Sequence, residues 1–319
     1  MFRYVFLLIT IVLLVSCEKE SKLEIDVSDI EVNTIIKRFD QEFYTSPVSK
    51  LPQLKANYPY LFPSQNNDSI WVNKMQDSDE QELFAETEKL YSNFDNEKEQ
   101  LRNLFRHILY YFPYFKPPTV ITLLTNVDYN SSIVYADSLL FISLDVYLGK
   151  DSEIYLDFPN YVKNSFTKEH LVVDVATAIS KVQIPPSSDR SFISRLIQEG
   201  KRMYLLDAYL PNLSDAEKIG YTQEQIDWAD FNDEDIWKYF VQNQLLFSSD
   251  QELSKRFIDE APFSKFYQAN DNDSPGRVGV WIGWQIVRAY MNNNNTSLKE
   301  LLKTANEDIF KKSKYKPTK

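Results

Sequence analysis

Near Gly149 the hydrophobic pattern of this chain changes from mixed strand and helical periods to an almost entirely helical one. Before that residue, β-branched and aromatic runs at 119–125 and 131–145 have strand composition, and shorter runs of the same kind occur at 25–27 and 32–39. After it, apolar residues recur every three or four positions almost to the end. Strands followed by helices predict an α+β fold, with a small mixed sheet and a mainly helical C-terminal half.

Two helical stripes interrupt the strand-like first half. Apolar side chains recur with helical spacing over residues 83–94 and again over 101–112, where Pro113 ends the second stripe. The Pro- and Asn-rich stretch 46–68 predicts a long irregular connection. Because no repeat or linker divides the remainder, we predict a single globular domain over residues 31–319.

The N-terminus has the pattern of an export signal. A short basic start is followed by the apolar run 5–15, which is too short to span a bilayer as a helix. The run ends at Leu14-Val15-Ser16-Cys17, an order typical of the lipobox that precedes a lipidated cysteine. We therefore predict a signal peptide at 1–16, lipid on Cys17 and a lipidated tether over 17–30.

Cys17 is also the only cysteine, so no disulfide can form within the chain. The two or more acyl chains expected of this modification anchor a protein stably, whereas a single chain gives only marginal binding. We expect an envelope protein that is attached to a membrane by lipid and faces the periplasm. The sequence leaves open whether that membrane is the inner or the outer one.

The overall charge restricts the partners. A net charge of -11 argues against nucleic acid, or an anionic membrane face, as the main partner. The one basic cluster lies at the C-terminal end, where a solvated tail is the expected role. Its members are Lys311, Lys312, Lys314, Lys316 and Lys319.

Three helices of the second half contain the residues of interest. The stripe 171–182 and the segment 191–210 predict two helices in succession, and the run 274–284 opens a third. In the third helix, Gly279 and Gly283 lie one turn apart on the same face. A phosphate loop would need its glycines before the helix, so we predict close packing against another backbone.

Several spaced segments resemble the GldB family of gliding-motility lipoproteins. They are the lipobox start and residues 135–149, 172–178, 198–200 and 276–284, so that the resemblance extends over essentially the whole chain. The resemblance implies a cell-envelope component that is required for bacterial gliding and is functionally tied to the type IX secretion apparatus. It also implies partners among the other gliding or secretion proteins.

The same segments resemble the scaffold of gluzincin peptidases. In that layout an edge strand precedes a helix with an H-E-x-x-H motif, and the next helix supplies a glutamate ligand. The overlay places the motif on residues 173–177, with Asp174 at the general-base position, and the downstream ligand on Glu199. The only histidines, His107 and His170, lie far apart in the chain and cannot supply two imidazoles one turn apart.

We therefore predict a zincin-like core that has lost its metal site and acts by protein binding, with no cofactor and no catalytic residue. Asp174 and Glu199 are the candidates for a degenerate site. In the simplest arrangement His170 and Asp174 hydrogen-bond along their helix, while Glu199 pairs with Arg195 or Arg202.

Three alternatives remain open from the sequence. His170, Asp174 and Glu199 could form an improvised metal site, in which case the protein would be an active metal-dependent peptidase with unusual ligands. It could instead be an envelope ligand-binding lipoprotein, which predicts a deep and mostly apolar pocket. The identity of the partner and the oligomeric state also stay open.

Two further side-chain groups are expected at the surface. His107 lies off the apolar stripe of its helix, which predicts a surface imidazole. The acidic residues between 227 and 235 lack a glycine at the turn position of a calcium-binding loop, so a solvated helical face is expected.

Overall fold

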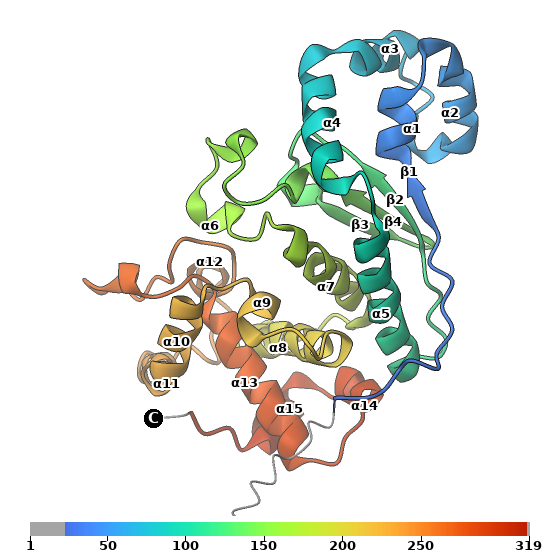
Figure 1. Ribbon diagram of the computed structural model, residues 1–319. Coiled ribbons are helices and arrows are strands. Elements are labelled where there is room, and N and C mark those ends of the chain that lie inside the picture. The colour runs from blue at the N-terminus through green and yellow to red at the C-terminus, as the bar shows by residue number, and fades with distance from the viewer. Residues whose placement is uncertain (1–22, 318–319) are drawn as a thin grey trace, which may run out of the picture.

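The computed structural model describes residues 23–317 (Figure 1). The predicted signal peptide at 1–16 and the lipidation site Cys17 lie outside the described residues. Residues 23–30 form no helix or strand, yet Val27 is buried and the carbonyl of Ile30 accepts a hydrogen bond from Arg106. Within the described range, no helix is long and apolar enough to cross a membrane.

The first half contains a small mixed sheet of four strands. They are β1 (Ile36–Arg38), β2 (Thr119–Leu123), β3 (Ile133–Ala136) and β4 (Leu139–Ser143), in the spatial order β1-β2-β4-β3. The first, second and fourth strands run parallel, while β3 is antiparallel at one edge. With the helices that follow, the sheet confirms the predicted α+β class.

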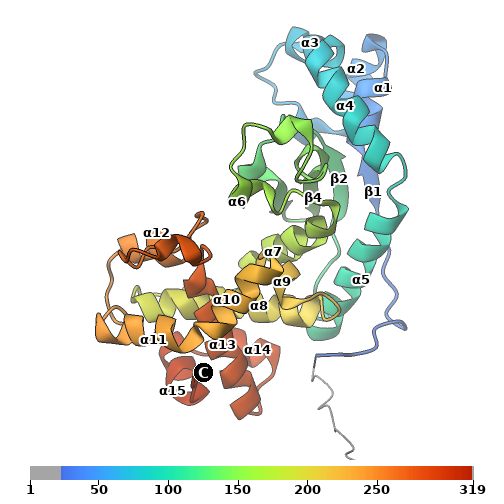
Figure 2. The ribbon, with the colours of Figure 1, turned by 60° about the vertical axis from the view of Figure 1, so that its left-hand side comes forward.

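Four helices cover one end of the sheet (Figures 1 and 2). They are α1 (Phe39–Thr45), α2 (Leu51–Asn57), α3 (Asp68–Gln76) and α4 (Ser78–Tyr91). The prediction of an irregular connection over 46–68 was wrong, because α2 lies within it and buries Leu51 and Leu54. Seven residues are too few to show helical periodicity, and Pro52 lies at the start of the helix, where proline is tolerated.

The strand-like runs near the N-terminus also differ from expectation. The run 32–39 forms a strand only at Ile36–Arg38, and the run 25–27 forms none. These residues run along the outside of the domain. They pair with another strand only from Ile36 onward, which lies opposite Val120 of β2. Composition alone cannot say whether such a partner exists.

Helices make up the rest of the chain. The long helix α5 (Asp95–Tyr111) leads into the sheet, and α7 lies between the sheet and the C-terminal helices (Figure 2). The helices after the sheet are α6 (Asn160–Lys163), α7 (Leu171–Gln183), α8 (Phe192–Tyr209), α9 (Asp215–Ile219), α10 (Gln223–Phe231), α11 (Asp233–Gln242), α12 (Glu252–Phe257), α13 (Val278–Asn293), α14 (Leu298–Lys303) and α15 (Asn306–Ser313).

Helices α8 and α13 pack backbone against backbone. A Cβ atom added to Gly283 would lie 1.8 Å from the carbonyl oxygen of Leu196, and one added to Gly200 would lie 2.0 Å from the carbonyl oxygen of Gly283. At Gly279 an added Cβ would lie 2.7 Å from the carbonyl oxygen of Phe257. The prediction that these glycines serve close packing is confirmed, and this contact fixes α8 in place.

One prediction of a surface residue was wrong, and a second was wrong at one of its five residues. His107 is buried, and its Nδ1 lies 2.9 Å from the carbonyl oxygen of Asn103. The reason is that α5 packs against both α7 and α8, which covers more of its circumference than the apolar stripe. Burial lowers the pKa of His107 and favours the neutral imidazole.

In the acidic group between residues 227 and 235, Asp233 is buried rather than solvated. Its carboxylate accepts hydrogen bonds from the indole of Trp281 and the hydroxyl of Tyr315. These donors come from distant parts of the chain, so no local pattern revealed them. Asp233 therefore holds the C-terminal segment against α13.

Candidate functional site

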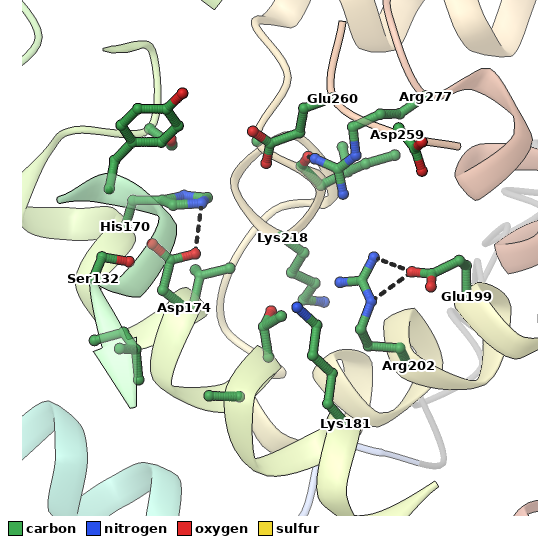
Figure 3. Close-up of a pocket in the computed structure, with 18 of the residues that line it drawn as sticks. Ser132, His170, Asp174, Lys181, Glu199, Arg202, Lys218, Asp259, Glu260 and Arg277 are labelled. Carbon is green, nitrogen blue, oxygen red and sulfur yellow. Dashed lines mark hydrogen bonds and ion pairs between the residues drawn. The ribbon is translucent and has the colours of Figure 1, made fainter. Parts of the chain in front are cut away.

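A cavity of about 740 Å³ opens between the sheet and the C-terminal helices (Figure 3). The edge strand β3 and helix α7 form one wall. The other wall comes from α8, the end of α9 and the residues just before α13. The cavity therefore lies where the strand-rich and the helical parts of the chain meet.

Helix α7 presents His170, Asp174 and Lys181 to the cavity. These positions are four and seven residues apart, so they share one face of the helix. The Nε2 of His170 lies 3.5 Å from Oδ1 of Asp174, as predicted for a pair along the helix. On its other oxygen, Asp174 accepts a 2.8 Å hydrogen bond from the hydroxyl of Tyr147.

Tyr147 follows β4 and is fully buried. Burial, together with the nearby Asp174 carboxylate, raises the pKa of Tyr147 well above its usual value. Its hydroxyl therefore keeps its proton and donates it to Asp174 as a hydrogen bond. Asp174 is thus held by one donor from the sheet and one neighbour on its own helix.

Helix α8 contributes Glu199 and Arg202. The Nη2 and Nε atoms of Arg202 lie 2.7 and 2.8 Å from Oε2 of Glu199. Of the two predicted partners, Arg202 is the correct one, since Arg195 instead donates to the side chain of Ser254 and the carbonyl of Asp250.

The carboxyl of Glu199 has a shifted pKa. Burial alone would raise it, but the charge and hydrogen bond of Arg202, together with the charges of Arg277 and Lys181, lower the pKa of Glu199 below its usual value. Glu199 therefore stays ionised at neutral pH and bound to arginine.

The structure places both degenerate-site candidates in one cavity but does not bring them together. Asp174 lies on the α7 wall, while Glu199 lies beyond Arg202 on the α8 wall (Figure 3). Across residues 23–317, no group of three or more His, Cys, Asp or Glu side chains is arranged to hold a metal ion. In the described part of the chain, His170, Asp174 and Glu199 are therefore not gathered as a set of metal ligands.

A family model described as "Gliding motility protein GldB" matches residues 20–317. The chain belongs to the GldB family. It is thus a member of a family of gliding-motility lipoproteins. Comparisons with curated proteins and with solved structures find no match. The roles of individual residues in this GldB-family protein must therefore be argued from its own geometry.

Sequence reasoning missed three residues that line the cavity, and it also missed the role of Tyr147, which does not line the cavity but donates to Asp174. Tyr147, Lys218 and Arg277 come from separate segments, and no local spacing linked them to Asp174 or Glu199. The position of Lys181 could have been predicted from the sequence, because it lies seven residues after Asp174 and so shares the same helical face.

Positively charged side chains converge inside the cavity. In Figure 3 the charged ends of Lys181, Lys218 and Arg202 point toward one another, and Arg277 reaches in from the opposite side. Lys218 is buried, and its Nζ lies 3.1 Å from Oδ1 of Asp207. Two exposed carboxylates, those of Asp259 and Glu260, lie near Arg277 at the far side of the cavity.

Proposed function

We propose that this protein is a lipid-anchored envelope component of the gliding machinery that binds a partner protein in this cavity and has no peptidase activity. The observation that carries the proposal is that both candidate carboxylates are already engaged. Asp174 accepts from Tyr147 and faces His170, and Glu199 is paired with Arg202.

The proposed absence of peptidase activity follows from the ligands that a zinc site needs. Catalytic zinc takes three protein ligands and keeps one open position. At the two histidine positions of the overlay this chain has Val173, which is buried, and Thr177. Arg202 holds Glu199 through its Oε2 atom, and His170 is the one imidazole that lines the cavity.

The order of elements supports a zincin-like scaffold. The antiparallel edge strand β3 contacts α7, and the next helix, α8, places Glu199 across the cavity. This is the order in which the gluzincin layout uses its strand, its motif helix and its downstream glutamate. We therefore propose a peptidase-like scaffold that retains the cleft and lacks the metal.

Strand β3 offers a surface for protein binding. No other strand of the described chain pairs with its outer edge. The amide of Ser143 donates to the carbonyl of Ser132, so the alternation of an antiparallel ladder turns the backbone groups of Ile133 and Tyr135 away from β4. An extended segment of a partner can pair with such an edge and enter the cavity, which these residues line.

The charged lining also favours a protein ligand. The alternative of an envelope ligand-binding lipoprotein predicted a mostly apolar pocket, whereas lysines, arginines and carboxylates from both walls face this one. We propose that this partner is one of the gliding proteins or a component of the type IX secretion apparatus, as the family resemblance suggests.

Site-directed photo-crosslinking in motile cells tests the proposal. A photoreactive residue at Val134, on the cavity side of β3, should capture an envelope protein, while one at the highly exposed Tyr114 should not. If Val134 captures nothing in cells that glide normally, the binding proposal is wrong.

The lipid anchor has its own test. Cys17→Ser should leave the body folded, because residue 17 precedes the packed domain, but should abolish acyl labelling and release the protein from the membrane. A variant that stays in the membrane fraction after a high-salt wash would refute the anchor.

A further inference from the structure

The cation cluster of the cavity consists of Lys181, Arg202, Lys218 and Arg277. Arg202 pairs with Glu199, and Lys218 pairs with Asp207. Asp207 is itself shared, because Arg288 donates to both of its oxygens. In the described part of the chain, two of the four cations therefore have an ion-pair partner within 4 Å.

Lys181 and Arg277 make no such contact. Among the described residues, neither forms an ion pair within 4 Å. Lys181 is exposed on α7, and the guanidinium of Arg277 is fixed by a 3.0 Å hydrogen bond to the carbonyl oxygen of Ile219. Two cations without a direct ion pair thus flank the pairs made by Arg202 and Lys218.

Like charges that converge in a partly enclosed space repel each other more strongly than they would in open water. A bound anion relieves that repulsion and replaces lost hydration with charge-assisted hydrogen bonds. We propose that Lys181, Arg202, Lys218 and Arg277 form a binding site for a carboxylate group of the partner segment that enters the cavity. This inference rests on the proposed binding function and specifies the chemistry that the cavity recognises.

A carboxylate fits this site better than a more highly charged group. Four carboxylates also line the cavity, namely those of Asp174, Glu199, Asp259 and Glu260. Doubling the charge of the ligand doubles both its attraction to the cations and its repulsion from these acids. It raises the cost of taking the ligand out of water more than twofold, which favours the singly charged group. Against the effect of its burial, Arg202 and, to a smaller extent, Arg277 and Lys181 lower the pKa of Glu199, which is consistent with a carboxylate being stabilised at this place.

A carboxylate can come from the C-terminus of the partner or from an acidic side chain, and three probe peptides distinguish these sources. The first is acetyl-trialanine with a free carboxylate, the second is its amide, and the third is the amide of acetyl-Ala-Glu-Ala. Binding to the full-length mature lipoprotein in detergent is followed by saturation-transfer NMR. The first or the third probe should bind, and the second should bind at least about tenfold more weakly.

Lys181→Gln should weaken the binding of the preferred probe about tenfold, because it removes one charge-assisted contact. Its fold should persist, since Lys181 is exposed and makes no ion pair in the described chain. The matched control is Lys116→Gln, an exposed lysine outside the cavity, which should leave binding unchanged. Equal binding of all three probes, no binding of any, tighter binding of methyl phosphate, or an unchanged affinity of Lys181→Gln would overturn the carboxylate site.

Crosslinking distinguishes a failure of the proposed carboxylate site from a failure of the proposed binding function. If Val134 captures a partner in cells with wild-type protein and equally in cells with Lys181→Gln, the partner enters the cavity without using the cation cluster. The carboxylate site would then be wrong while the binding function would stand. Loss of the crosslinked product in Lys181→Gln cells, at unchanged protein abundance, supports both.

Discussion

Helix α8 contacts α13 on one side and lines the cavity on the other, and the two sides are held by different interactions. Toward α13, Gly200 and Gly283 leave no room for even a methyl group. Toward the cavity, Glu199 is about one third exposed and pairs with Arg202. One side is defined by contact between backbones, and the other by charges that face open space.

This difference separates residues needed for the fold from residues available for function. A close-packed backbone contact rejects any added atom whatever its chemistry, because neither helix can move without disturbing the core. A partly exposed ion pair contributes only about 0 to 1 kcal/mol to stability. The cavity side of α8 can therefore change its charge while the protein stays folded.

The largest expected effect is at the helix contact. Gly283→Ala should lower the free energy of unfolding by about 3 kcal/mol or more, because its Cβ would overlap the carbonyl oxygen of Leu196. Urea unfolding measures this loss, and Asn292→Ala, at an exposed position of the same helix, should stay within about 0.5 kcal/mol of the wild type. A loss below about 1 kcal/mol for Gly283→Ala would contradict the proposed rigidity.

The second prediction tests whether the buried charges between α8 and α13 tolerate substitution as poorly as the glycines do. Arg288 of α13 forms short ion pairs with both Asp207 and Asp215, and Asp207 is nearly buried. Arg288→Met should lower the free energy of unfolding by about 2 to 3 kcal/mol, because Asp207 loses one of its two cations. The exposed pair Lys311–Glu307 provides the control, since Lys311→Met should cost less than about 0.5 kcal/mol. Equal losses for the two variants would mean that burial does not decide the outcome.

Substitutions on the cavity side of α8 should change the free energy of unfolding less, and the change should depend on pH. Glu199→Gln should lower the free energy of unfolding by at most about 1 kcal/mol at pH 7. Because the pKa of Glu199 is lowered in the folded protein, the stability it adds is present above its unfolded pKa of about 4.3 and is lost as the pH falls through the folded pKa. Thermal unfolding at pH 7 and pH 3.5 should therefore show a difference between wild type and variant that shrinks in acid. A difference that grows in acid would refute the ion pair.

Removal of metal should have the smallest effect. Since the carboxylates of Asp174 and Glu199 are engaged by Tyr147 and Arg202, chelator treatment of the purified protein should not shift its melting temperature. Metal analysis by mass spectrometry should find well under one equivalent of zinc. One tightly held equivalent that is lost in His170→Ala would restore the metallopeptidase alternative.

Local sequence patterns predicted the α+β class, the helices around Asp174 and Glu199, and the glycine contact, because each of these depends on spacing within one segment. They failed where distant segments decide the outcome. His107 is buried by two helices that pack on α5, and Asp233 is buried by Trp281 and Tyr315. Lys218 reaches the cavity from α9 and Arg277 from the start of α13, so the cation cluster exists only after folding.

The most direct test of a binding role is gliding speed in cells whose protein carries both Asp174→Asn and Glu199→Gln, with protein abundance measured in the same cultures. Each substitution keeps the size and much of the hydrogen bonding of the side chain, so a binding cavity should remain and the cells should glide normally. Removal of an essential base or ligand would instead cost several orders of magnitude in rate. Loss of gliding at unchanged abundance would contradict the account.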